Sequence, residues 1–186
     1  FARLEDSTIS SPFFFSGLSI FSSPCEAMSF SSDYSELYLS IIAATDGKEK
    51  IYRANLSERD GNSGWIIGEQ ALSFCEDGYS YFHPALSFSG DIMIFASDKN
   101  GSQTGMDLFI TRKENEKWQA SEILSTTINS KGNEFFPFLD SENNLYFSSD
   151  GLPGFGGYDI YCCQYNDEGW ETPVNLTKII NTEADE

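Results

Sequence analysis

Four aspartates are the side chains of this sequence best suited to hold a metal ion. Asp150 and Asp159 flank a glycine-rich loop, and Asp98 and Asp107 flank an equivalent loop. Carboxylates and loop carbonyls are oxygen ligands that calcium prefers, but the residue spacing of an EF-hand is absent. Carboxylates beside glycine turns also accept backbone N–H bonds, which fixes a loop without a metal. We therefore predict that these aspartates pin hairpin loops and that the chain holds no metal or other cofactor.

The glycine-rich loop, residues 151–157, also raises the question of phosphate binding. A phosphate-binding loop of the P-loop type opens a helix and carries a lysine. This loop contains no lysine and joins two segments with strand composition. The sequence therefore does not support a nucleotide-binding site here.

His83 is the only histidine, so a Ser-His-Asp or Cys-His catalytic site would have to use it. An internal repeat aligns His83 with Phe136 and with Cys25, directly before a predicted strand. A position that holds phenylalanine and cysteine in the other copies is typical of packing. We predict that His83 packs and does not catalyse.

Acidic residues are abundant enough to supply the carboxylate pair of a glycosidase. Such chemistry needs two carboxylates at a set separation in one pocket. The candidates Glu134 and Asp140 occupy ordinary loop positions, and the Asp box of sialidases is absent. We therefore expect that this chain is not an enzyme.

The residues singled out above recur because the sequence repeats itself. The matched positions, at an offset of 52 residues, are Asp150 and Asp98, Asp159 and Asp107, Gly157 and Gly105, Trp170 and Trp118, and Ile180-Asn181 and Ile128-Asn129. Several matches at one offset are typical of a repeat protein.

A weaker copy lies upstream. Residues 27–33, Ala-Met-Ser-Phe-Ser-Ser-Asp, match residues 85–91, Ala-Leu-Ser-Phe-Ser-Gly-Asp, at an offset of 58. Further along, Ile51-Tyr52 matches Leu108-Phe109 and Trp65 matches Trp118, at shorter offsets. We attribute the change in offset to connecting loops of different length.

Each copy contains four short segments with strand composition, and no segment has a helical hydrophobic period. In the second copy these segments are residues 85–88, 92–96, 107–111 and 118–124. The run from Ile92 to Phe95 is apolar at every position, as in a strand buried on both faces. Four antiparallel strands in a repeat of about 50 residues describe a β-propeller blade. A β-sandwich is the alternative, but it does not predict repeats of Asp, Gly and Trp at one period.

We therefore predict an all-β chain with about three four-stranded propeller blades, at residues 25–80, 82–132 and 135–186. Residues 1–24 are expected to hold the remnant of a leading strand and a connection. Trp65, Trp118 and Trp170 recur once per blade. Their rings could form a sugar-binding set, but recurrence in every blade favours packing at blade edges.

Charge and hydropathy exclude several kinds of partner. The formal net charge of −18 over 186 residues repels nucleic acid and anionic lipid. No stretch is long and apolar enough for a membrane span. The negative net charge does not identify a positively charged binding partner, because net charge commonly serves solubility.

The four cysteines, Cys25, Cys75, Cys162 and Cys163, show no CxxC spacing of a zinc or redox site. Cys162 and Cys163 are adjacent in a predicted strand, so their side chains point to opposite faces. We expect packing residues rather than a disulfide framework.

Residues 147–161, Phe-Ser-Ser-Asp-Gly-Leu-Pro-Gly-Phe-Gly-Gly-Tyr-Asp-Ile-Tyr, resemble the TolB-like (WD40-like) β-propeller repeat. More narrowly, they resemble the version found in Bacteroidetes cell-envelope proteins. The motifs Trp-Glu-Thr-Pro-Val-Asn-Leu at 170–176 and Ile-Asn-Thr at 180–182 fit the same pattern. The resemblance covers residues 25–186, and it is loosest in the first copy, where residues 43–48 replace the glycine-rich loop.

The resemblance implies a binding or scaffolding module of a bacterial cell envelope, located in the periplasm or at the outer-membrane periphery. In such proteins the propeller often accompanies a peptidoglycan-binding OmpA-like domain, and some are associated with type IX secretion. The implied partner is another envelope protein. The alternatives are the propeller domain of a hydrolase, either a glycosidase or a peptidase, and a purely structural spacer.

Three blades cannot close a ring, because closed propellers generally have four to eight blades. The two outermost blade faces are therefore expected to expose apolar surface that favours association. We expect that the natural protein continues with more blades, as part of a six-bladed ring. The alternative is self-association through the open faces.

Overall fold

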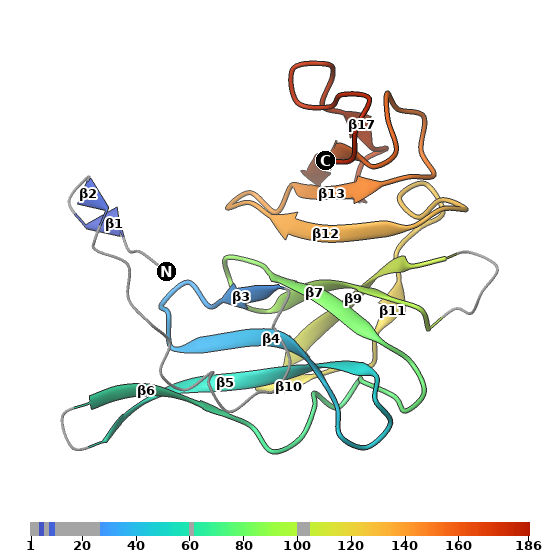
Figure 1. The fold of residues 1–186 in the computed structure, drawn as a ribbon. Coiled ribbons are helices and arrows are strands. Elements are labelled where there is room, and N and C mark those ends of the chain that lie inside the picture. Colours follow the sequence, from blue (N-terminus) through green and yellow to red (C-terminus); the bar gives the residue numbers. More distant parts are fainter. Residues whose placement is uncertain (1–3, 6–7, 10–26, 60–61, 100–104) are drawn as a thin grey trace.

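The computed structural model describes residues 4–5, 8–9, 27–59, 62–99 and 105–186 (Figure 1). These residues form strands, turns and loops and include no helix. Accordingly, the described part of the chain has no helix that could span a membrane. The predictions for Cys25 and for most of residues 1–24 lie outside this set. Within that segment the structure describes one small sheet, of β1 (Leu4–Glu5) and β2 (Thr8–Ile9).

Three antiparallel sheets of consecutive strands make up the rest. The first contains β3 (Met28–Phe30), β4 (Glu36–Ile42), β5 (Glu49–Arg59) and β6 (Asn62–Ile67). The second contains β7 (Tyr81–Leu86), β8 (Ile92–Ser97), β9 (Asp107–Glu114), β10 (Lys117–Trp118) and β11 (Glu122–Ile123). The third contains β12 (Glu134–Leu139), β13 (Leu145–Ser149), β14 (Asp159–Cys163) and β17 (Val174–Asn175), beside a hairpin of β15 (Tyr165–Asn166) and β16 (Gly169–Trp170).

The three sheets stack on one another (Figure 1), and their first strands converge. Strand β7 of the second sheet contacts both β3 of the first sheet and β12 of the third. We call β3, β7 and β12 the inner strands. This stacking of four-stranded meanders around converging inner strands is the arrangement of propeller blades.

Strand β8 shows why its sequence is apolar at every position. Ile92 and Ile94 lie in the core between the second and third sheets, whereas Met93 and Phe95 lie in the core between the first and second sheets. Side chains of a strand alternate between the two faces, and here both faces are covered. The prediction of a doubly buried strand is confirmed.

The inner strand β7 begins at Tyr81, four residues before the expected start at Ala85. A register shift lies between Phe82 and Ala85, and the third sheet has an equivalent shift. At its centre His83 has a φ of 51°, and Phe136 at the equivalent position has a φ of 50°. A bulge of this kind lets the inner strand continue past its proline, Pro84 in β7 and Pro137 in β12.

The expected strand at residues 118–124 is divided into β10 and β11, which both pair with β9. Gln119 N donates to Arg112 O, and the next pair is Glu122 with Ile110. Two residues, 120 and 121, therefore stand opposite Thr111. The extra residue is a bulge that interrupts the ladder.

The sequence match between the first and second copies is two residues out of register. Ser31 Oγ accepts a hydrogen bond from Glu36 N at 2.9 Å, and Ser87 Oγ accepts the same bond from Ile92 N at 3.1 Å. The structure thus aligns Ser31 with Ser87, whereas the sequence match aligns it with Ser89. A shift of two residues leaves each side chain on the same face of its strand, so hydrophobic patterning does not detect it.

A buried asparagine explains the repeated Ile-Asn pair. Asn129 Oδ1 accepts from Leu108 N at 2.7 Å, and Asn129 Nδ2 donates to Leu108 O at 3.0 Å. Asn181 makes the same two bonds with Ile160, at 2.8 and 2.9 Å. Each side chain therefore supplies the acceptor for a third-strand N–H, and it shares the third-strand C=O with a backbone donor, Leu124 N or Leu176 N.

The outward faces of the first and third sheets differ. Leu37 and Leu39 of β4 are fully buried in a cluster with side chains of β3 and β6. On the third sheet, Phe138 and Ile180 are about half exposed. The expectation of an open face therefore holds for the third sheet, whereas on the first sheet Leu37 and Leu39 are buried and Leu56 is 45% exposed.

Candidate ligand-binding site

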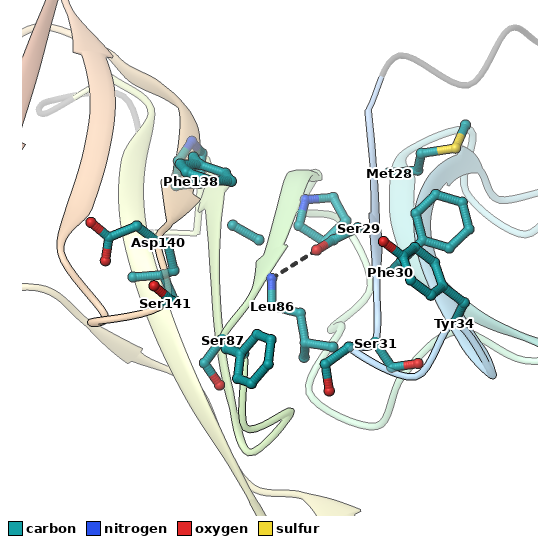
Figure 2. Close-up of a pocket in the computed structure, with 16 residues that line it drawn as sticks. Met28, Ser29, Phe30, Ser31, Tyr34, Leu86, Ser87, Phe138, Asp140 and Ser141 are labelled. Atoms are coloured by element: carbon teal, nitrogen blue, oxygen red, sulfur yellow. Dashed lines mark hydrogen bonds between the residues drawn. The ribbon is translucent and has the colours of Figure 1, made fainter. Parts of the chain in front are cut away.

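A pocket of about 550 Å³ opens where the three inner strands end (Figure 2). Its walls are residues 28–32, 84–88 and 137–141, together with Tyr34. These segments are the ends of β3, β7 and β12 and the turns that follow them. Each sheet thus contributes the same part of its repeat, and the pocket exists because the sheets stack around converging strands.

Large aromatic rings surround this pocket and remain accessible. Tyr34, Phe88 and Phe138 are 58%, 66% and 60% exposed. Figure 2 shows Phe138 on one side of the pocket and Tyr34 on the other. Folding normally removes such rings from water, so their grouping around a concave site is typical of ligand binding.

A hydrogen bond between two sheets lies within the pocket. Leu86 N of β7 donates to Ser29 Oγ of β3 at 2.9 Å (Figure 2). Pro84 and Pro137, at equivalent places in two inner strands, also line the pocket and restrict the backbone there. The pocket is therefore preformed rather than assembled around a ligand.

Each turn at the pocket carries an aspartate. The Ser31 hydroxyl, with the Ser35 amide and hydroxyl, lowers the pKa of Asp33 to about 2. The Ser89 hydroxyl lowers the pKa of Asp91. For Asp140 burial opposes ionisation, but bonds from Asn144 outweigh it and the pKa is lowered. All three carboxylates are charged at neutral pH, and Asp140 is the one of the three that lines the pocket.

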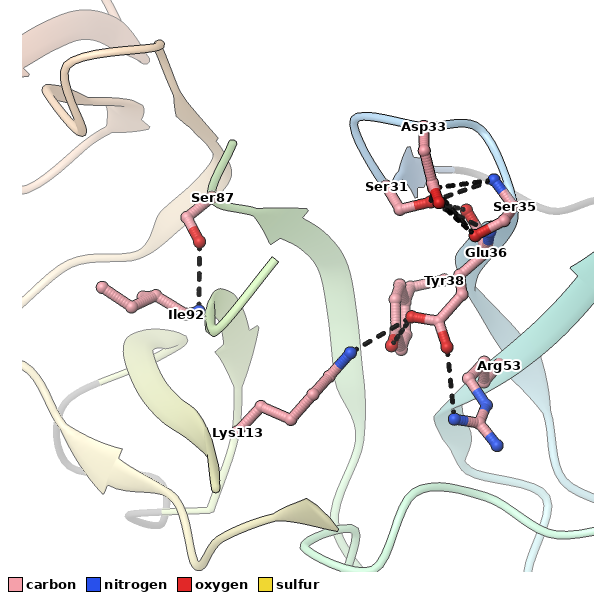
Figure 3. Close-up of polar contacts among 9 residues, drawn as sticks. All are labelled: Ser31, Asp33, Ser35, Glu36, Tyr38, Arg53, Ser87, Ile92 and Lys113. Atoms are coloured by element: carbon pink, nitrogen blue, oxygen red, sulfur yellow. Dashed lines mark hydrogen bonds and ion pairs between the residues drawn. The ribbon is translucent and has the colours of Figure 1, made fainter. Parts of the chain in front are cut away.

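A charged network joins the first and second sheets next to these turns (Figure 3). Glu36 accepts a hydrogen bond from Tyr38 Oη at 2.7 Å and pairs with Lys113 at 3.1 Å and Arg53 at 3.3 Å. Burial raises the pKa of Glu36, but the Tyr38 hydroxyl and Lys113 outweigh burial, and the pKa is lowered overall. Lys113 also lies 5.0 Å from the ring centre of Trp118.

Two of the predicted aspartates bond to the segments that lead into the inner strands. Asp98 Oδ1 accepts from Ser80 N at 2.7 Å, and Asp150 Oδ1 accepts from Asn133 N at 2.5 Å. Ser80 and Asn133 each precede the inner strand of the same sheet. These contacts differ from the expected pinning of the glycine-rich hairpin, because the carboxylates point along the sheet toward the inner strand.

Asp159 makes the loop contacts that the sequence suggests. Its Oδ2 accepts from Phe155 N at 2.6 Å, and a Cβ at Gly154 would overlap that oxygen. Glycine is therefore required where the carboxylate approaches the loop. Its equivalent, Asp107, is also buried. In the described part of the chain, no group of three or more His, Cys, Asp and Glu is placed to hold a metal.

His83 lies inside the bulge of β7 and is buried. Its ring stacks on Phe136 with centroids 3.9 Å apart, and Phe136 N donates to His83 Nδ1 at 3.4 Å. Burial lowers the pKa of His83 to about 4, so the imidazole is neutral at physiological pH.

The two carboxylates considered for glycoside hydrolysis are in different environments. Glu134 is fully buried and accepts from the Ser130 hydroxyl at 2.6 Å and the Ser149 hydroxyl at 2.7 Å. Burial raises its pKa. Asp140 lines the pocket, and Glu134 does not. The structure therefore does not bring this pair together around a substrate.

The three tryptophans contact the hydrophobic clusters. Trp118 is buried between the first and second sheets, with its ring 5.7 Å from that of Tyr38. Trp65 packs with Phe30 at 5.7 Å, and Trp170 packs on the third sheet's cluster. None of the three lines the pocket at the inner strands.

The residues around that pocket were not predicted as a site. Their one signal in the sequence is the repeated Ser-Phe-Ser motif, which places an aromatic residue beside a turn in two copies. An exposed aromatic at the end of a strand cannot be told from a buried one by sequence alone.

Comparisons with known proteins bear on the fold. No protein-family model matches the chain, and no curated protein matches it. A solved TolB candidate from Agrobacterium tumefaciens matches with a TM-score of 0.56 and 15% identity, over 88% of this chain and 54% of that chain. TolB from Acinetobacter baumannii matches with a TM-score of 0.48 and 14% identity, over 80% and 32%. A puromycin-hydrolysing peptidase from Mycobacterium tuberculosis matches with a TM-score of 0.44 and 21% identity, over 80% and 22%.

The chain thus spans about half or less of the length of these structures. The Agrobacterium structure, at 15% identity, is evidence for the fold alone. Together with the three stacked sheets, it defines the class: an all-β chain with a TolB-like β-propeller fold, here represented by three blades. The predicted fold class is confirmed.

Proposed function

We propose that this chain is a non-enzymatic protein-binding module that takes its ligand in the pocket at the ends of the inner strands. The observation that carries the proposal is the pocket itself: three equivalent segments build it, and three accessible rings surround it. A rigid repeat scaffold that presents turn residues on one side is a common basis for binding sites.

The chemistry of the pocket favours a basic polypeptide segment with large apolar residues. Tyr34, Phe88 and Phe138 offer apolar contact, and the carboxylates of Asp33, Asp91 and Asp140 lie in the same turns. Lysine and arginine are attracted to carboxylates and to aromatic faces. The net charge of −18 adds long-range attraction for such a segment.

The absence of catalysis is part of this proposal. His83 is enclosed in a bulge and neutral, and Glu134 is enclosed by two serine hydroxyls. Neither group lines the pocket. A general base must reach the proton that it removes, and these groups do not face a substrate-sized space.

We also propose that the module acts in a bacterial cell envelope, in the periplasm or at the outer-membrane periphery. The support is the resemblance of residues 147–161 to the propeller repeat of envelope proteins, together with the TolB-like fold. A role in a peptidoglycan-linked or type IX secretion-associated assembly is the finer form of this proposal.

Binding of labelled peptides, measured by fluorescence anisotropy, tests the ligand site. The probes are an octapeptide that alternates lysine with phenylalanine and a counterpart in which glutamate replaces lysine. We expect the basic probe to bind, with affinity that falls as salt increases, and the acidic probe not to bind. Phe138→Ser should weaken binding of the basic probe by roughly tenfold or more.

Ile179→Ser is the matched control, because Ile179 is 91% exposed and does not line the pocket. Equal binding of both probes, or equal loss in both variants, would contradict the site. Hydrolysis of peptide, ester or glycoside substrates by the purified chain would contradict the non-enzymatic role.

A further inference from the structure

A second pocket lies between the first and second sheets, at their outer strands, and we call it the outer pocket. Its volume is about 470 Å³, and it is lined by Arg53 and Asn55 of β5 and by residues within 68–73 and 116–119. The first of these ranges belongs to the connection from β6 to β7, and the second includes β10. The outer pocket shares no lining residue with the pocket at the inner strands.

Arg53 occupies a position of the repeat that is apolar in the other two sheets. It pairs with Tyr38 across β4 and β5, as Ile110 pairs with Ile94 across β8 and β9. The third sheet has Cys162 at the same place. Ile110 is 8% exposed and packs in the core between the second and third sheets. A charged residue where the repeat uses an apolar one departs from the pattern of the fold, and such departures are typical of functional sites.

The ion pair of Arg53 leaves most of its hydrogen-bonding capacity unused. Its Nη1 donates to Glu36 Oε1 at 3.3 Å, and Lys113 pairs with the same carboxylate (Figure 3). A guanidinium has five N–H donors. Within the described part of the chain, the other N–H groups of Arg53 have no partner, and its side chain is 43% exposed. These donors are therefore available to a ligand.

Two amide side chains lie beside Arg53 in the outer pocket. Asn55 is on the same face of β5, because side chains alternate along a strand. Gln70 is held near β5 because Gly68 N donates to Arg53 O at 2.8 Å. Both amides are exposed and make no hydrogen bond to the described residues. An amide is both donor and acceptor, so it is suited to a hydroxyl group, which has the same two functions.

The wall opposite β5 is fixed and offers little aromatic surface. Ser73 Oγ donates to Trp118 O at 3.2 Å, and Leu72 N donates to Ile51 O at 2.8 Å. Trp118 lines the outer pocket, but it is only 8% exposed. A ligand here is therefore recognised mainly through its polar groups, with minor apolar contact at Leu72 and Trp118.

The charge of the outer pocket differs from that of the whole chain. Its lining includes Arg53 and Lys117 and one acidic residue, Glu116. The pocket at the inner strands is lined by Asp140 and by no basic residue. The net charge of −18 repels an anion at long range, but salt screens this repulsion over about 8 Å under physiological conditions. The cations within the pocket therefore decide which ligand is attracted.

We propose that the outer pocket binds an acidic saccharide, a sugar of the uronic acid type. Arg53 binds the carboxylate, because the guanidinium fork matches the two carboxylate oxygens. Asn55 and Gln70 exchange hydrogen bonds with the ring hydroxyls, and Leu72 and Trp118 contact the C–H groups of the ring. Lys117 adds a second positive charge at the edge of the site.

An acidic peptide is the competing ligand, and the lining favours the saccharide. A sugar ring carries hydroxyls on adjacent carbons beside its carboxylate, which suits polar side chains that converge on one short pocket. A peptide presents apolar side chains that this pocket has little surface to receive. The site is separate from the proposed peptide-binding pocket and selects the opposite charge, so the two proposals fail independently.

Titration of the full chain, followed by nitrogen–proton correlation NMR, tests the proposal. The probe is a trisaccharide of mannuronic acid, and the references are the mannose trisaccharide of the same linkage and triglutamate. The readout is the indole N–H signal of Trp118. The indole of Trp170, which donates to Asn143 O at 2.8 Å and lies outside the outer pocket, is the internal control.

We expect the acidic trisaccharide to shift the Trp118 signal to saturation and to leave Trp170 unchanged. The neutral trisaccharide should bind about tenfold more weakly or less, because it lacks the carboxylate that Arg53 binds. A neutral sugar that binds equally well, triglutamate that binds more tightly than the acidic sugar, or no shift of Trp118 would overturn the proposal.

Arg53→Gln should weaken binding of the acidic trisaccharide by about tenfold or more. Arg112→Gln is the matched control, since Arg112 is exposed and does not line the outer pocket. Glu36→Gln removes the protein partner of Arg53 and should not weaken binding, which separates a ligand contact from a purely structural ion pair. Gln70→Leu should weaken binding by roughly threefold without removing a contact of the fold.

Equal losses in Arg53→Gln and Arg112→Gln would contradict the site. Weaker binding after Glu36→Gln would show that Arg53 acts only through its ion pair. Unchanged binding after Gln70→Leu would contradict the role of the amides, and this variant decides the outcome if Arg53→Gln does not fold.

Discussion

At the residue scale, the repeated buried polar side chains form hydrogen bonds within the protein's own fold. Asn129 and Asn181 bond to the third strands of their sheets, and Glu134 is enclosed by serine hydroxyls. A buried polar group that is paired contributes little net stability, but removing its partner is costly. The repeated polar residues are therefore explained by the fold.

Asn129→Ala should lower the free energy of unfolding by roughly 1–3 kcal/mol, because it leaves the buried N–H of Leu108 unpaired, whereas Leu108 O keeps its bond from Leu124 N. Denaturation in urea measures this change. Asn166→Ala removes an exposed amide that bonds to Glu171, and it should change stability by less than about 0.5 kcal/mol. Equal losses in the two variants would argue against the role of Asn129.

Asp159→Ala should lower the free energy of unfolding by roughly 1–3 kcal/mol, because the N–H groups of Phe155 and Gly156 lose their acceptor. Thermal unfolding of the wild-type chain, with and without calcium, tests the alternative role of the carboxylate. A melting temperature that calcium leaves unchanged fits a loop-pinning aspartate. A clear rise with calcium would identify a metal site.

His83 should make stability depend on pH. Burial lowers its pKa from 6.5 to about 4, so between these values the unfolded chain binds a proton that the folded chain does not. The free energy of unfolding therefore falls as pH decreases from 6.5 to 4, by roughly 3 kcal/mol in total.

His83→Phe should remove this component, because Phe136 shows that the bulge accommodates phenylalanine at a φ of 50°. Urea denaturation at several pH values compares the two chains, and carboxylates contribute equally to both. Identical pH profiles would mean that His83 titrates normally.

At the element scale, turns and strand ends do more than connect the sheets. The turns after β3, β7 and β12 form the pocket, and the end of β9 reaches the start of β4 through Lys113 and Glu36. Neighbouring blades are thus joined by polar contacts near the pocket, in addition to their apolar cores. This arrangement holds the pocket walls at fixed positions.

A double-mutant cycle on Lys113→Met and Glu36→Gln should give a coupling energy of about 1 kcal/mol, since both side chains are partly buried. The pair of Lys48 and Asp98 is the reference. Its atoms are 3.7 Å apart and more exposed, so its coupling should be close to zero. A larger coupling in the reference pair would contradict a link between blades at Glu36.

At the scale of the whole molecule, the two outward faces behave differently. Leu37 and Leu39 of β4 are buried, whereas the third sheet exposes Phe138 and Ile180. Exposed apolar surface of this kind drives association. We therefore expect the exposed face of the third sheet to determine whether residues 1–186 associate in solution.

Residues 1–186 should associate in a concentration-dependent way, as measured by multi-angle light scattering. Ile180→Asp should reduce association, because it places a charge on the exposed face. Ile179→Asp is the control, since Ile179 is the more exposed residue but its equivalent, Thr127, is also exposed. A monomer at all concentrations, or the same response in both variants, would contradict association through this face.

The sequence by itself determined the all-β class, the repeat and the doubly buried strand at residues 92–95. These features depend on local patterns: alternation of side chains along a strand, turn residues, and matches at one offset. The same repeat also identified Asn129 and Asn181 as equivalent, although only the structure gave their partners.

Only the tertiary structure decided the register of the first copy, the partners of Asp98 and Asp150, and the pocket. The register differs by two residues, which preserves the face of every side chain and so leaves no trace in the pattern. The aspartates bond to residues 17 or 18 positions away. The pocket joins three segments that are about 50 residues apart in the sequence, and stacking of whole sheets, rather than any local preference, brings them together.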